Sequence, residues 1–304
     1  MTLSRQERGQ AAVFVVVALI ALLGMAALVL DVGVWYKTQR HLQAKADASA
    51  LAAAQALPFH TDQAHALALD YSSRNNDVSS ATTEVTFQTR FMPDDTVAVK
   101  ESTTAPGTFV RLFGIDSVAV GARATARAQQ PVRARHVAPM VVSEKHPLLS
   151  GNGCPCFGEE TQLDYDPLGA PGAFGMLNLE NDGGTVGTSE EANWILHGHS
   201  SYLGLGWYRS DPGAKFSSNE VIDALESRIG TVLLFPVYRT LKGGGQNAEY
   251  DIIGWVGFLL ESYNMHGNNA KLYGKFTEFI ADGITSDSDP DQPYFGVRTI
   301  TLVN

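Results

Sequence analysis

The stretch Ala11–Leu30, AAVFVVVALIALLGMAALVL, contains twenty residues and no charge. As a helix that rises about 1.5 Å per residue it would be roughly 30 Å long, which matches the hydrocarbon thickness of a bilayer. Arg5 and Arg8 precede it, and Trp35-Tyr36-Lys37 follows it, as expected of a membrane interface. The stretch therefore predicts a transmembrane anchor.

A cleaved secretory signal is the competing interpretation, because such signals also begin with basic residues and an apolar run. The apolar part of a signal usually covers about 7–15 residues and ends at a small-residue cleavage site. Here the run is longer and continues into helix-favouring residues, with no proline before Pro58. The sequence favours an anchor that is prolonged as a helical stalk, roughly 70 Å long in all.

Eight residues around the apolar stretch occur in a specific order. They are Gly9, Asp31, Gly33, Tyr36, Leu42, Gln43, Ala46 and Asp47, followed by the alanine-rich run 48–53. Residues 9–57 thereby resemble the N-terminal segment of the TadG-like and TadE-like proteins of the tight-adherence (Flp) pilus assembly system. The resemblance implies a bacterial, single-pass membrane component of pilus assembly without enzymatic activity. Its implied partners are the lipid bilayer and other pilus assembly proteins.

The orientation in the membrane does not follow from charge, because cations stand at similar distances on both sides of the stretch. These cations are Arg5 and Arg8 before it and Lys37, Arg40 and Lys45 after it. The family resemblance implies a short cytoplasmic N-terminus and an extracytoplasmic C-terminal body, held in the cell (inner) membrane.

The family resemblance also bears on whether the chain is a filament subunit. Pilins of the type IV class resemble it in having a Gly before an apolar helix, and they carry a Glu at the fifth position after that cleaved Gly. Counted from Gly9, the fifth residue here is Phe14, and residues 10–30 contain no acid. The sequence leaves open whether the N-terminus is processed.

The net charge argues against some classes of function for the remaining chain. The 304 residues carry a formal net charge of −10, and 18% of them are charged. A chain of this kind has no general attraction to nucleic acid or to an anionic membrane surface. The part after the stalk is long enough for one large domain or two ordinary domains with buried cores.

The whole chain predicts an α+β fold in three regions. Residues 1–58 form the cytoplasmic tip, the transmembrane helix (about 11–30) and the stalk. Residues 59–130 form a small α/β pilin-like domain with the order α-β-β-α-β, in which Thr61 is placed to cap the first helix. The polar segment 129–135 contains Pro131 and marks a boundary. The pattern up to about residue 130 is also similar to TadE/TadG-type proteins.

Residues 131–304 predict a β-rich, mostly antiparallel extracytoplasmic domain with one packing helix. That helix covers residues 217–229, with Ser217 and Glu220 in capping-box register and Gly230 as its stop. Residues 190–196 are consistent with either a short helix or a strand. The region also resembles the C-terminal part of some TadG-related proteins, which implies no activity.

Two clusters in this region raise the question of metal binding. In an extended strand, His197 and His199 would lie on one face, as zinc ligands often do. No HExxH pattern supplies a third ligand or a base, so we expect structural histidines. The acidic run 287–291 has carboxylates at the first positions of a calcium loop but lacks its later Gly and Glu. We therefore predict no metal site and no cofactor.

Cys154 and Cys156, which flank Pro155, are the cysteines of this chain. A local disulfide between them is the expectation we favour over a redox or metal role, because their surroundings carry little positive charge apart from His146. The sequence has no nucleophile elbow, and Gly243–Gly245 is not followed by the Lys and Ser/Thr of a phosphate loop. No catalytic residue is predicted. A surface binding protein or adhesin, and a hydrolase that uses His197 and His199, remain the alternatives to pilus assembly.

Overall fold

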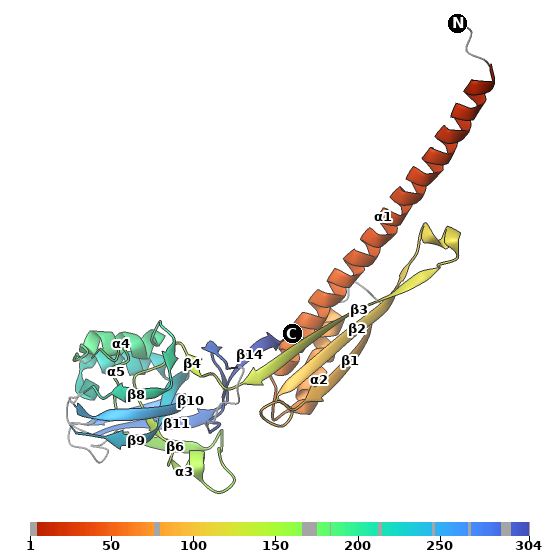
Figure 1. Ribbon diagram of the computed structural model, residues 1–304. Helices are drawn as coiled ribbons and strands as arrows, with labels where there is room; N and C mark the ends of the chain where they lie inside the picture. The colour runs from red at the N-terminus through yellow and green to blue at the C-terminus, as the bar shows by residue number, and fades with distance from the viewer. Residues whose placement is uncertain are drawn as a thin grey trace. The chain divides into compact units, whose positions relative to one another are not determined.

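The computed structural model describes residues 5–75, 80–165, 175–182, 184–211, 215–244, 247–266, 269–286 and 293–303 (Figure 1). Its fold is α+β, with a long apolar N-terminal helix, a small helix-and-strand region and a β-rich region, which confirms the predicted class. Contacts divide the chain into two compact units. The first unit is Met1–Ala128 with Ile300–Asn304, and the second is Gln129–Thr299.

The first unit begins with α1 (Arg5–Ala54), a continuous helix of 50 residues. Side chains of residues 11–30 are almost all exposed, although they are apolar. Among the described helices, α1 is the one that is long and apolar enough to cross a membrane. An uncovered apolar surface of this length is what a helix in lipid presents to its surroundings.

The second half of α1 packs into the core of the first unit. The residues of its buried face include Leu42, Lys45, Ala46, Ser49, Ala50 and Ala53. Their helical spacing brings them to one side of α1, where the small alanines allow close approach to Val97, Val99 and Ala126 of the neighbouring sheet. The stalk predicted from the sequence is therefore also part of this core.

The rest of the first unit follows the predicted order. Its elements are α2 (Thr61–Arg74), β1 (Thr82–Gln88), β2 (Thr96–Pro106), the 3-10 turn η1 (Val110–Phe113) and β3 (Ser117–Gln129). The strands pair in antiparallel order β1-β2-β3, and the end of β14 (Val297–Val303) lies next to β3. The predicted cap of α2 is wrong: Thr61 is already helical, and the N-cap residue is His60, whose side chain makes no capping bond.

The second unit is built on a six-stranded sheet with the order β5-β9-β10-β11-β6, in which β8 also pairs with β10. The strands are β5 (Val142–Ser143), β6 (Glu160–Tyr165), β8 (Gly206–Arg209), β9 (Val232–Lys242), β10 (Glu249–His266) and β11 (Asn269–Thr277). A small sheet joins β13 (Gly283–Ile284), β4 (Arg133–Ala134) and β7 (Leu203–Gly204), and β12 (Phe279–Ile280) pairs with β14. The pairs β5/β9 and β12/β14 are parallel and the others antiparallel.

Helices cover one face of this sheet. The predicted helix is α5 (Asn219–Arg228), and a second helix, α4 (Thr188–His197), packs beside it (Figure 1). Ile195 of α4 and Leu225 of α5 share a core with Phe235 of β9, so the segment whose state the sequence left open is a helix with a buried face. The capping box predicted at Ser217 is wrong by one residue. Ser218 accepts from the Val221 N–H at 3.2 Å, because residues up to Ser217 form the 3-10 turn η2 (Lys215–Ser217).

Candidate functional site

The main candidate site lies where the apolar part of α1 ends. The Asp31 carboxylate is buried, and it accepts hydrogen bonds from the backbone N–H groups of Thr108, Phe109 and Val110 at 3.0, 2.8 and 2.7 Å. These groups start the turn η1, whose first N–H groups have no partner inside the turn itself. A side chain 77 or more residues away in sequence thus caps the turn.

A second contact supports this attachment one turn further along α1. The Trp35 indole N–H donates to the Pro106 carbonyl oxygen at 3.2 Å, at the end of β2. Together, Asp31 and Trp35 hold the loop between β2 and β3 against α1. We call this loop, residues 107–116, the tip loop.

The other family-motif residues have separate places in the first unit. Leu42 and Ala46 are fully buried in the core. Gln43 donates to the Asp47 carboxylate at 2.8 Å and to the Arg123 carbonyl oxygen at 3.1 Å, which joins α1 to β3. The side chain of Tyr36 is exposed, and Gly33 lies in open space on α1.

A buried ion pair that the sequence analysis missed also joins α1 to the sheet. Lys45 Nζ lies 3.3 Å from a carboxylate oxygen of Glu101 on β2, and both side chains are at most 5% exposed. The Thr83 hydroxyl oxygen lies 3.0 Å from both oxygens of Glu101 and 2.6 Å from the Ser72 hydroxyl of α2. The one signal for it in the sequence is that Lys45 falls on the apolar face of α1.

The segment that carries these contacts was compared with known proteins. Residues 9–56 match the family described as "Putative Flp pilus-assembly TadE/G-like". This is a TadE/G-like segment. No curated protein and no solved structure matches the chain. The match confirms the resemblance suggested by the motif residues of this segment, and together with the apolar helix it fits a membrane component of Flp pilus assembly. Asp31 and Gln43 of the TadE/G-like segment therefore contact the rest of the first unit, whereas Asp47 accepts from Gln43 within α1.

The structure does not bring His197 and His199 together as ligands. His197 is the exposed last residue of α4, whereas His199 is buried against Trp194. The His199 Nε2 atom lies 3.2 Å from the Glu180 carboxylate. In the described ranges no group of three or more His, Cys, Asp or Glu side chains could hold a metal ion. The acidic run 287–291 and Gly245 lie outside the described residues.

Cys154 and Cys156 are bonded to each other, with their Cα atoms 4.6 Å apart. The loop that holds them follows α3 (Pro147–Ser150), and the Cys156 N–H donates to the Leu148 carbonyl oxygen at 2.8 Å. The Cys154 N–H donates to the Gly151 carbonyl oxygen in the same loop at 2.9 Å. The bond therefore lies within a loop that is also held by backbone hydrogen bonds.

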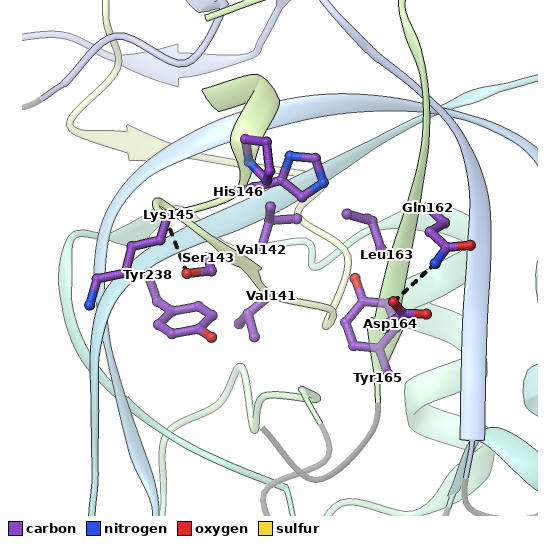
Figure 2. Close-up of a pocket in the computed structure, with 11 residues that line it drawn as sticks. Val141, Val142, Ser143, Lys145, His146, Gln162, Leu163, Asp164, Tyr165 and Tyr238 are labelled. Carbon is purple, nitrogen blue, oxygen red and sulfur yellow. Dashed lines mark hydrogen bonds between the residues drawn. The ribbon is translucent and has the colours of Figure 1, made fainter. Parts of the chain in front are cut away.

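A groove of about 390 Å³ lies between β5 and β6, the outer strands of the six-stranded sheet (Figure 2). Val142 and Ser143 line it from β5, and Leu163 and Asp164 line it from β6. His146 closes one side: its Nε2 atom lies 3.2 Å from the Thr161 hydroxyl, and burial lowers its pKa. The two edges of the sheet therefore line the same groove.

A further cluster of buried ionisable side chains occurs where α4 meets η2. Glu191 of α4 is fully buried, and its carboxylate lies 3.4 Å from Lys215 Nζ. Lys215 also pairs with the buried Asp211 and donates to the Val186 carbonyl oxygen. Burial and the neighbouring Asp211 carboxyl raise the pKa of Glu191 to about 9, against the opposing effect of Lys215. Glu191 is thus protonated at neutral pH.

Glu191→Gln is expected to remove a decrease in the free energy of unfolding that the unchanged protein shows as pH rises. The pKa of Glu191 is about 9 in the folded chain and 4.5 without perturbation. The unfolded chain therefore releases a proton that the folded chain keeps, and the free energy of unfolding falls as pH rises between these values, by at most about 1.4 kcal/mol per pH unit. Urea unfolding from pH 5 to 9 measures this slope. The exposed neighbour Glu190, changed to Gln, is the matched control, and equal slopes in the two variants would contradict the prediction.

Proposed function

We propose that this chain is a single-pass membrane component of Flp pilus assembly that acts as an anchor or assembly partner and catalyses no reaction. The observation that carries the proposal is the set of hydrogen bonds from residues 108–110 to Asp31. Asp31 lies in the TadE/G-like segment, directly after the apolar part of α1. These bonds join the apolar part of α1 directly to the folded first unit. A displacement of α1 in the membrane would therefore also displace the first unit.

In this proposal the residues before Ala11 face the cytoplasm, and both units lie outside the inner membrane. The bond between Cys154 and Cys156 supports this orientation, because disulfides persist mainly in oxidising compartments. Partners in the membrane would contact the exposed apolar surface of α1. Partners outside it would contact the two units.

The proposal also treats the chain as an accessory that does not polymerise. A carboxylate inside an apolar filament can neutralise the amino terminus of the neighbouring subunit, where an unpaired charge would be costly. Residues 10–30 contain no acid, and the first acid after them, Asp31, is occupied by the tip loop. The chain has a pilin-like helix without a free carboxylate for this purpose.

A surface binding protein or adhesin is the second candidate, and the groove between β5 and β6 is the observation that favours it. A metal-dependent hydrolase at His197 and His199 has no such support, because the two side chains lie in different environments.

Deletion of the gene tests the proposed function. We expect surface fibres to disappear while the pilin subunit is still synthesised, and we expect the full-length chain to restore them. The protein should be found in the membrane fraction at full length. Normal fibres after deletion would contradict a role in assembly. Recovery of the chain along sheared fibres, with its N-terminus trimmed to Gln10, would contradict the accessory role.

A further inference from the structure

We infer that the tip loop inserts its apolar end into the lipid bilayer beside α1. The inference rests on the proposed membrane anchoring and goes beyond it, because an anchor needs only the apolar part of α1. Figure 1 shows the loop between β2 and β3 next to α1. The partner is thus the membrane lipid itself, contacted by a second segment of the chain.

The first argument is the depth at which the tip loop is held. A groove of about 290 Å³ lies between Phe109, Val110 and Phe113 of the loop and residues 21–28 of α1. At about 1.5 Å per residue, these positions of α1 lie roughly 3–14 Å inside the apolar stretch that ends at Leu30. A medium that surrounds this part of α1 also surrounds the tip loop. For a membrane helix that medium is the hydrocarbon of one leaflet, which is about 15 Å thick.

The second argument is the exposure of the loop's apolar side chains. Leu112 is 86% exposed and Phe113 is 77% exposed, and the side chains of Phe109 and Ile115 are exposed as well. A cluster of large apolar side chains with this exposure is unfavourable in water and marks a site of interaction. The acyl chains of the adjoining leaflet would cover it and enter the groove between Phe109, Phe113 and α1.

The third argument is that most backbone N–H groups of the loop have an acceptor within the protein, which a segment in contact with hydrocarbon needs. Asp31 accepts from residues 108–110, and further N–H groups bond within the loop. These further bonds are Gly107 to Asp116, Leu112 to Phe109, Gly114 to Arg111 and Ile115 to Val110. Gly114 makes the closing turn possible, because its φ of 83° is unfavourable for other residues.

The charges of the loop limit how deep it reaches. Arg111 and Asp116 form an exposed ion pair at 3.2 Å. The long stem of an arginine can keep its guanidinium at the headgroup level while apolar neighbours lie deeper. Leu112 and Phe113 would therefore enter the outer acyl region, with Arg111 at the level of the headgroups.

Site-specific fluorescence of the full-length protein in phosphatidylcholine vesicles tests the inference. Three variants, each with one added cysteine, carry an environment-sensitive NBD label: Leu112→Cys in the tip loop, Leu23→Cys in the apolar part of α1, and Glu84→Cys on β1. All three side chains are exposed, so the changes leave the core intact. The native cysteines are bonded to each other and do not take up the label. Each variant is measured with and without lipids that carry a nitroxide on the acyl chain.

We expect the label at position 112 to show blue-shifted emission and quenching by the nitroxide lipid, as at position 23, while position 84 emits as in water. Quenching at 23 with water-like emission at 112 would overturn this inference and leave the anchor intact. Water-like emission at both positions would overturn the anchor as well. A blue shift at 112 without quenching would mean that protein, and not lipid, covers the loop, which also overturns the inference.

Discussion

Glu101→Ala is expected to lower the free energy of unfolding of the first unit by about 3–5 kcal/mol. The change leaves Lys45 with its charge buried and its partner removed, since the ammonium group lies in a core where the side chain is 5% exposed. It also removes the acceptor of the Thr83 hydroxyl. Urea unfolding in detergent, followed by hydrogen exchange in β2 and α2, measures the loss.

The double variant Lys45→Met/Glu101→Leu is the control for this pair. It replaces both charges with apolar side chains of similar size, and such replacements in buried pairs are often neutral or stabilising. We expect it to recover most of the stability lost in Glu101→Ala. The exposed pair Lys100–Glu84 on the same sheet should contribute at most about 1 kcal/mol. Equal losses from Glu101→Ala and Glu84→Ala would contradict the assignment of a buried pair.

Asp31→Ala is expected to lower the stability of the first unit by roughly 2–4 kcal/mol and to release the tip loop. The carboxylate is the acceptor for three consecutive backbone N–H groups, and an alanine leaves all of them without it. Amide hydrogen exchange at residues 108–110 should accelerate strongly. In cells that lack the gene, this variant should reach the membrane but should not restore surface fibres.

Two further variants test whether the loss of stability is specific to the Asp31 carboxylate or follows from any change of an acid in the TadE/G-like segment. Asp31→Asn keeps one acceptor oxygen and should show an intermediate effect. Asp47→Ala changes another acid of the same segment, whose described hydrogen bond comes from Gln43 on the surface of α1, and it should cost less than about 1 kcal/mol. Unchanged exchange at residues 108–110 in Asp31→Ala would refute the capping role.

Much of the architecture could be read from the sequence because its signals are local. The apolar stretch 11–30 is recognised as a candidate membrane span without reference to any other part of the chain, because length and hydrophobicity decide that test. The order α-β-β-α-β and the strands of the second unit follow from periodicity within short windows. Helix ends depend on the neighbouring turns as well: the sequence predicts caps at Thr61 and Ser217, whereas the N-cap residues are His60 and Ser218.

The amino-acid sequence by itself determined a long apolar N-terminal helix, a TadE/G-like segment and an α+β fold class. Only the tertiary structure decided what the polar residues of that segment do. Asp31 accepts hydrogen bonds from residues 108–110, and Lys45 forms an ion pair with Glu101. These partners are too far apart in the sequence for a local pattern to predict them. The physical reason is that a buried charge is tolerated only where folding supplies its partner, and a partner so distant is found by packing and not by spacing in the sequence.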